Sequence, residues 1–213
     1  MCWSATADLA AGSVICALGV TCVARVRRAR DLPLAALPLV LGAHQLIEAA
    51  VWHRGGGTGP ATLAWAIIAL PLLAAYVPLA VLTAAPPGGR LRLAVPVLAG
   101  LATAVVLVAC LIDRAPVADI RGHTVGYAVD VPAVPLVIAG YLVATVGSLL
   151  LSADRMLRLL GVLTGVGAAV CAAVWRTEFV STWCAFAAVV SVVLLLWVRR
   201  PSTGPAPTAP VLS

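Results

Sequence analysis

Seven long apolar stretches, separated by short polar or Gly- and Pro-rich connections, dominate the pattern of hydrophobic and polar positions along the chain. Each stretch has roughly the 20 residues that an α-helix needs to cross a bilayer. The runs are continuous, whereas the strands of a membrane barrel alternate apolar and polar positions over about ten residues. The pattern therefore predicts an all-α fold, a polytopic membrane helical bundle with seven transmembrane helices. The expected spans are residues 5–26, 32–52, 60–84, 93–112, 132–152, 159–175 and 179–198.

The connections between these spans are too short to hold a soluble domain, so we expect one transmembrane domain over residues 1–200. The last segment, residues 201–213, is rich in Pro, Ala, Ser and Thr. That composition is typical of a disordered segment, and we expect it to form a cytoplasmic tail.

Composition supports the same class, because 62% hydrophobic and 10% charged residues cannot form a soluble surface. The expected partner is the lipid bilayer. The net charge of +6 is explained by membrane topology and by contact with anionic lipid head groups, so we expect no nucleic-acid partner.

The distribution of arginines predicts the orientation in the membrane. Assigning alternate connections to opposite sides places ten arginines on one side and four on the other. Cytoplasmic loops carry the excess of basic residues, so the N-terminus should lie outside and the C-terminus in the cytoplasm. The arginine-rich side comprises Arg25, Arg27, Arg28, Arg30, Arg90, Arg92, Arg155, Arg158, Arg199 and Arg200.

Two ionisable residues, His44 and Glu48, lie one helical turn apart inside the second apolar run. Such groups cost about 3 kcal/mol each on membrane-insertion scales, so they persist mainly where they face a bundle interior and have partners. Residues four apart share a helix face, which predicts a polar site in the outer half of the bundle. We expect Arg176 to pair with Glu48, since its planar guanidinium matches a carboxylate. The residues expected to bind a small ligand there are Ser4, His44, Glu48, Trp52, His123, Arg176 and Trp183.

A metal site is one interpretation of the same residues. Imidazole, carboxylate and thiol groups are the ligands of transition metals such as zinc, and Cys2, His44, Glu48 and Cys184 would supply them. Cys2 and Cys184 should approach each other at the outer face, as a disulfide or as joint ligands. The alternatives are a structural hydrogen-bond network around Glu48 and a path for protons or ions.

Several functions lack the residues that they need. The chain contains no lysine, so it cannot hold retinal through a Schiff base. It also has no Gly-Lys-Ser/Thr phosphate loop, no HExxH zinc motif and no Gly-x-Ser-x-Gly nucleophile elbow. The leading hypothesis is a membrane protein of unknown molecular function that binds a small ligand or a metal ion. The alternatives are a membrane-embedded metal- or thiol-dependent enzyme and a small-solute or ion transporter.

Three segments carry a resemblance to a known group of proteins. They are Met1 to Ala7 (MCWSATA), Leu41 to Glu48 (LGAHQLIE) with Trp52, and Trp183 to Ala188 (WCAFAA). The chain resembles an uncharacterised family of bacterial seven-helix membrane proteins, a domain of unknown function, that open with Met-Cys-Phe-Ser-Ala and close with Trp-Cys-x-Phe-Ala-Ala. Trp3 stands where the family usually has Phe, and the position of His44 is often Gln. The resemblance implies a multi-pass protein of the bacterial inner membrane and supplies no activity.

Overall fold

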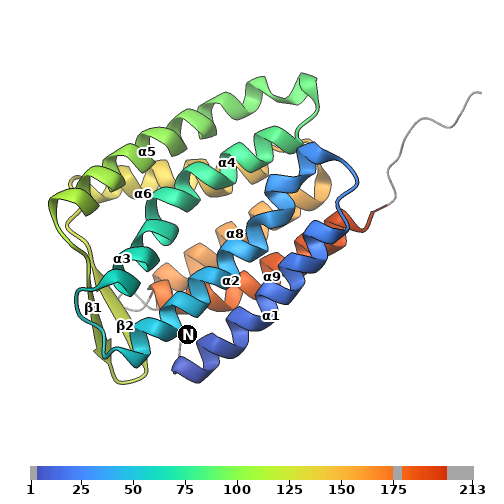
Figure 1. The fold of residues 1–213 in the computed structure, drawn as a ribbon. Helices are drawn as coiled ribbons and strands as arrows, with labels where there is room; N and C mark the ends of the chain where they lie inside the picture. The colour runs from blue at the N-terminus through green and yellow to red at the C-terminus, as the bar shows by residue number, and fades with distance from the viewer. Residues whose placement is uncertain (1–3, 175–178, 201–213) are drawn as a thin grey trace, which may run out of the picture.

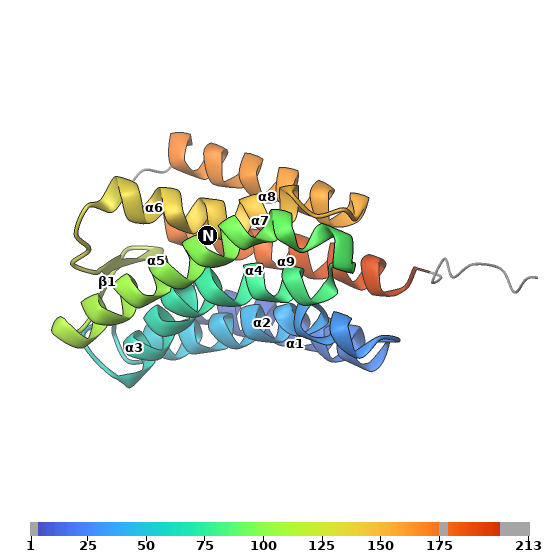
Figure 2. The ribbon, with the colours of Figure 1, turned by 90° about the horizontal axis from the view of Figure 1, so that it is seen from above.

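The computed structural model describes the backbone of residues 4–174 and 179–200, and the side chains of residues 4–170 and 186–200. Over these residues the chain is mostly helical, and its long helical segments run side by side along one axis (Figure 1). The first two helices are α1 (Ala5–Ala24) and α2 (Leu32–His53), joined through the short 3₁₀ turn η1 (Ala29–Asp31). The last two are α8 (Arg155–Val174) and α9 (Phe179–Val198). Figure 2 shows α8 on the face of the protein opposite α1 and α2.

The middle of the chain forms three further long segments, two of which contain a π-helical turn. The first runs through α3 (Pro60–Ile67), η2 (Ile68–Leu72) and α4 (Leu73–Ala84). The second is α5 (Ala94–Asp113), preceded by the 3₁₀ turns η3 (Pro87–Gly89) and η4 (Leu91–Leu93). The third runs through α6 (Val134–Leu142), η5 (Val143–Gly147) and α7 (Ser148–Leu150).

Among the described residues, four helical segments are long and apolar enough to cross a membrane: Ala5–Ala24, Ala29–His53, Pro60–Ala84 and Pro87–Asp113. Large apolar side chains also cover the outside of the helices, as Val105 (70% exposed) and Leu136 (74% exposed) illustrate. An extensive apolar surface of this kind is unfavourable in water and favourable in contact with lipid. The length and surface of these helices are those of a membrane protein.

Prolines within the spans are accommodated by contacts between helices. Pro71 lies in η2, and the hydroxyl of Tyr141 donates to the nearby carbonyl oxygen of Ala69 over 2.6 Å. Pro78 has no N–H for the carbonyl of Ala74, four residues earlier. A Cβ atom at Gly100 would overlap that carbonyl oxygen, so α5 approaches α4 closely only because position 100 is glycine. Proline and glycine thus set the crossing of α4 and α5.

One connection differs from the expected all-helical architecture. Residues 114–133 hold a β-hairpin of β1 (Val117–Arg121) and β2 (Thr124–Ala128), paired antiparallel. Arg121 pairs with Thr124, and Gly122 between them has a φ of 59°, which favours glycine. The expectation of a purely all-α chain is therefore wrong here, because alternating residues over a short segment form a strand pair where the apolar-run pattern indicated a loop.

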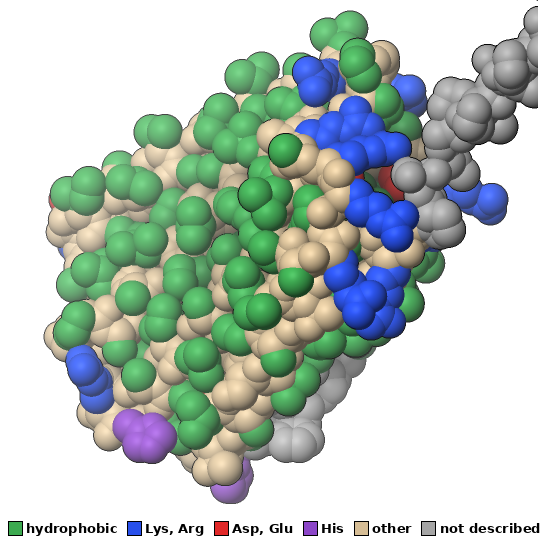
Figure 3. All heavy atoms as spheres, turned by 45° about the vertical axis from the view of Figure 1, so that its right-hand side comes forward, with side chains coloured by type: hydrophobic (Ala, Val, Ile, Leu, Met, Phe, Trp, Pro, Cys, Tyr) green, Lys and Arg blue, Asp and Glu red, His purple; other side chains and the backbone are tan. Residues whose placement is uncertain are grey.

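The two ends of the protein differ in charge. The end with the α1–α2 and α4–α5 connections, the start of α8 and the close of α9 carries ten arginines, and we call it the arginine end. The opposite end carries the hairpin, and we call it the hairpin end. Figure 3 shows arginine side chains gathered at the arginine end and histidines at the other. The largest apolar core, which includes Leu34, Val77, Leu157 and Leu194, lies toward the arginine end.

Candidate functional site

The hairpin-end half of α2 buries polar side chains among apolar ones. His44 is 8% exposed, Gln45 1% and Glu48 0%. The three residues lie on one side of α2. Around the helix axis, His44 is separated from Glu48 by about 40° and from Gln45 by about 100°. Glu48 therefore faces the protein interior and not lipid. With Asp8 and Trp65, these residues form what we call the polar cluster.

Asp8 joins the polar cluster from α1, where it is 2% exposed. Glycines set the register between α1 and α2: a Cβ atom at Gly12 would lie 3.0 Å from Cβ of Gln45, and one at Gly42 would lie 2.5 Å from Sγ of Cys16. The helices are antiparallel, so Asp8, one turn before Gly12, lies level with the residues next to Glu48. Small residues thus bring two buried carboxyl groups to the same depth.

Three aromatic rings lie in a row on the side of the cluster next to α3 and the hairpin. The rings of His44 and Trp65 have centroids 4.9 Å apart with planes tilted by 39°. The indole of Trp65, on α3, stacks on the phenol ring of Tyr127, on β2, with centroids 3.4 Å apart and planes within 3°. Helix α2, helix α3 and the hairpin are thereby joined through side chains that lie far apart in sequence.

The hairpin covers this end of the helices. Val51 of α2 packs with Ala118 and Val125 of the two strands. The backbone N–H of Gly57 donates to the carbonyl of Ala118 over 2.7 Å, and the N–H of Ala118 donates back to the carbonyl of Gly57 over 3.1 Å. At Gly56, whose φ is 78°, an added Cβ would lie 2.7 Å from the Ala118 carbonyl oxygen. The glycine loop after α2 is therefore a docking point for β1.

Several polar atoms in and beside the cluster are buried without a hydrogen-bond partner among the described residues. They are Nε2 of His44, Oε1 of Gln45 and the indole Nε1 atoms of Trp52 and Trp65. A buried donor or acceptor without a partner costs about 1–3 kcal/mol. Of these residues, His44, Gln45 and Trp65 are close neighbours, since His44 precedes Gln45 on α2 and its ring lies 4.9 Å from that of Trp65. Neighbouring buried groups without partners are typical of a place where a bound molecule supplies the missing hydrogen bonds.

Comparison with known proteins gives a family and no activity. A family model described as a family of unknown function (DUF6629) matches residues 1–209. The chain belongs to the DUF6629 family. No curated protein and no solved structure matches it.

The family match extends over the whole polar cluster of this DUF6629 protein and over the N- and C-terminal segments that carried the resemblance to a family of unknown function. Membership supports the family-level expectation. It assigns no role to any residue, so the site rests on geometry.

Some of the residues predicted for the site lie elsewhere. His123 is exposed in the hairpin turn, because the connection folds into a β-hairpin and His123 lies between its two strands. Ser4 is exposed at the start of α1, where its hydroxyl accepts a hydrogen bond from the N–H of Ala7 over 3.2 Å. That bond caps the helix, which is the usual role of serine at this position. Trp52 is half-buried and packs under the hairpin.

Four predicted residues, Cys2, Arg176, Trp183 and Cys184, lie outside the residues whose side chains are described. The pairing of Glu48 with Arg176 and the pairing of Cys2 with Cys184 therefore stay predictions. Among the described residues, no group of three or more His, Cys, Asp or Glu side chains could hold a metal ion.

The sequence pattern did not indicate four residues of this region. Trp65 and Tyr127 carry no ionisable group, and an aromatic residue in an apolar run gives no signal of a site. Gln45 stands beside His44 and gave the clearest missed signal, since a side-chain amide within a span also needs partners. Asp8 lies near the start of the first apolar run, where an acidic residue is ordinary at the end of a span and gives no signal of a buried site.

Proposed function

We propose that this DUF6629 protein is a seven-span protein of the cell membrane whose polar cluster binds a small polar molecule. In this proposal the hairpin end faces outside and the arginine end faces the cytoplasm. The charge distribution supports the orientation: among the described residues, ten arginines lie at the arginine end and Arg54, Arg114 and Arg121 lie at the other. Basic residues are retained preferentially on the cytoplasmic side.

One observation carries the binding proposal: Nε2 of His44, Oε1 of Gln45 and Nε1 of Trp65 are buried at one depth without hydrogen-bond partners among the described residues. The indole N–H can only donate and the amide oxygen can only accept. The ligand should therefore carry at least one acceptor and one donor, as a hydroxyl or amide group does. The carboxyl groups of Asp8 and Glu48, about one helical turn from His44 and Gln45, disfavour an anion, so we propose a neutral or cationic molecule.

The test is to identify small molecules that remain bound to the full-length protein in mild detergent, by native mass spectrometry. Trp65→Phe removes the indole N–H and retains an aromatic ring, while Gln45→Leu removes the acceptor at similar volume. Each change should reduce the retained ligand about tenfold, since one hydrogen bond in a buried site contributes about 1–2 kcal/mol.

Thr164→Val is the matched control, because Thr164 is buried in α8 and its hydroxyl already donates to the carbonyl of Leu160 over 2.7 Å. This variant should retain the ligand. Equal ligand content in wild type and all three variants would contradict the proposal. Metal content measured in the same samples tests the metal-site alternative, in which Glu48→Gln would remove a stoichiometric metal.

A further inference from the structure

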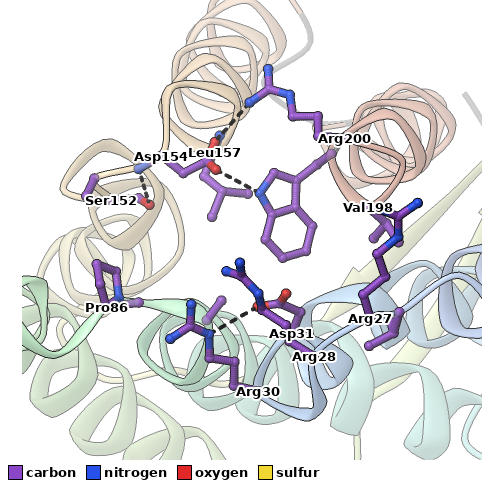
Figure 4. A pocket seen from close by; sticks show the side chains of 15 residues that line it. Arg27, Arg28, Arg30, Asp31, Pro86, Ser152, Asp154, Leu157, Val198 and Arg200 are labelled. Carbon is purple, nitrogen blue, oxygen red and sulfur yellow. Dashed lines mark hydrogen bonds and ion pairs between the residues drawn. The ribbon is translucent and has the colours of Figure 1, made fainter. Parts of the chain in front are cut away.

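A second site lies at the opposite end of the protein. A pocket of about 460 Å³ opens between the α1–α2 connection, the end of α4, the start of α8 and the end of α9. Figure 4 shows Arg27, Arg28 and Arg30 beside it on the α1–α2 connection and Arg200 just after the end of α9. The pocket is separate from the polar cluster and shares no residue with it.

The acidic side chains in this pocket are already engaged. The carboxylate of Asp154 accepts hydrogen bonds from the N–H of Met156 over 2.7 Å and from the indole of Trp197 over 3.1 Å. It also pairs with Arg200 over 3.5 Å. Asp154 therefore caps α8 and ties it to the end of α9, and it forms part of the pocket wall.

The guanidinium groups that line the pocket, in contrast, outnumber the carboxylates: four arginines face two aspartates. Asp31 lies 3.9 Å from Arg30. Neither Arg27 nor Arg28 forms an ion pair within residues 4–170 and 186–200. The charge of Arg28 acts on Asp31, but neither guanidinium is held in an ion pair within 4.0 Å among these residues. Planar guanidinium groups of this kind bind phosphate oxygens in pairs.

Apart from Ser152, the remaining lining is mostly apolar, with Val26, Pro86, Leu157 and Val198 among its residues. Exposed apolar side chains continue along the helices next to it, as at Leu32 (43% exposed) and Leu151 (44% exposed). A charged pocket that opens beside a lipid-facing apolar surface suits an amphiphile, whose head group and acyl chains have the same separation of character.

We infer that this pocket binds a phosphate-bearing anion, supplied by the head group of an anionic phospholipid. Arg27 and Arg28 contact the phosphate, Arg30 and Arg200 contribute positive potential, and the acyl chains follow the apolar surface beside α2 and α7. The inference concerns a different site from the proposed function and does not depend on it.

The experiment measures binding of phosphatidylglycerol to the purified full-length protein in detergent, by native mass spectrometry and by the shift in unfolding temperature. Phosphatidylglycerol should bind and raise the unfolding temperature, and phosphatidylcholine should not. Arg27→Gln with Arg28→Gln should weaken phosphatidylglycerol binding about tenfold or more, because charge-assisted hydrogen bonds are lost. The double variant with Arg27→Lys and Arg28→Lys keeps both positive charges but lacks the planar guanidinium groups. Its binding of phosphatidylglycerol should be weakened less than that of the double glutamine variant.

Arg90→Gln with Arg92→Gln is the matched control. It removes the same charge from the same end, at exposed residues that do not line the pocket, and should bind phosphatidylglycerol as wild type does. Equal weakening by both pairs, or no weakening by the Arg27 and Arg28 pair, would overturn the inference. Inorganic phosphate is the third ligand to be tested. If inorganic phosphate binds and its binding is weakened by the Arg27 and Arg28 changes, while phosphatidylglycerol does not bind, then the pocket takes free phosphate and the proposed lipid is wrong.

Discussion

The indole ring of Trp65 and the phenol ring of Tyr127 lie face to face, with centroids 3.4 Å apart, although 62 positions separate them in the chain. The stack joins α3, part of a segment long and apolar enough to cross a membrane, to the β-hairpin. Because Trp65 also contacts the imidazole of His44, the hairpin is connected through one ring to the polar cluster. Structure at the surface of the protein is therefore coupled to buried polar groups of α2.

Removal of the Tyr127 ring should detach the hairpin from α3. Tyr127→Ala loses the aromatic stack and its buried area, which we expect to cost about 1–3 kcal/mol of unfolding free energy. Tyr127→Phe keeps the ring and should keep the stack. The measurement is thermal unfolding in detergent together with protease cleavage within residues 117–128, which should accelerate only for Tyr127→Ala. Equal cleavage of the two variants would show that the ring does not hold the hairpin.

The contact between α4 and α5 depends on the absence of a side chain at position 100. Gly100→Val places carbon atoms against the carbonyl oxygen of Ala74 and the ring of Pro78, so we expect a loss of about 1–3 kcal/mol in unfolding free energy. Gly88→Ala is the control, because an added Cβ at Gly88 meets no atom within 4 Å. Thermal unfolding should distinguish the two. A Gly100→Val protein as stable as wild type would show that the helices can separate without cost.

Asp154 connects the start of α8 to the end of α9. Asp154→Ala removes the cap of α8 and the acceptor for Trp197, and should lower the unfolding free energy by about 1–2 kcal/mol. Asp154→Asn keeps a side-chain oxygen that can cap the helix, so its loss should be about half as large or less. Unfolding temperatures of the two variants test this order. The prediction fails if the asparagine variant is the less stable of the two.

The orientation can be tested with single cysteines in a variant whose six native cysteines are replaced. His123→Cys lies at the exposed tip of the hairpin, and Gly88→Cys lies at an exposed position of the arginine end. A membrane-impermeant maleimide added to intact cells should label position 123, and should label position 88 only after permeabilisation. The reverse labelling would contradict the orientation, and labelling of both positions in intact cells would contradict a span between them.

The helix positions were largely predictable, because the bilayer sets the length of each apolar run. The span predicted at residues 60–84 corresponds to the segment Pro60–Ala84, even with two prolines inside it. The π-helical turn at Ile68–Leu72 and contacts from neighbouring helices absorb Pro71. Whether all seven segments cross the membrane remains a proposal, since apolar length alone qualifies four of them among the described residues.

The hairpin was not predictable in the same way. Its strands are five residues long, and much of what holds it is tertiary: the bridge between Gly57 and Ala118, and the stack of Tyr127 on Trp65. Local sequence carries little information about such contacts. The burial of His44 and Glu48 could be expected from their position in an apolar run. The approach of Trp65 to His44 could not, because it is also a contact between separate segments of the chain.

We propose that a bound molecule completes the hydrogen bonds of the polar cluster. The most direct measurement is an experimental density map of the full-length protein, purified in mild detergent, at a resolution that shows side chains and ordered ligands. We expect non-protein density larger than a water within about 2.7–3.2 Å of Nε1 of Trp65 and Oε1 of Gln45. A map in which protein groups or single waters alone occupy both hydrogen-bonding positions would contradict the claim.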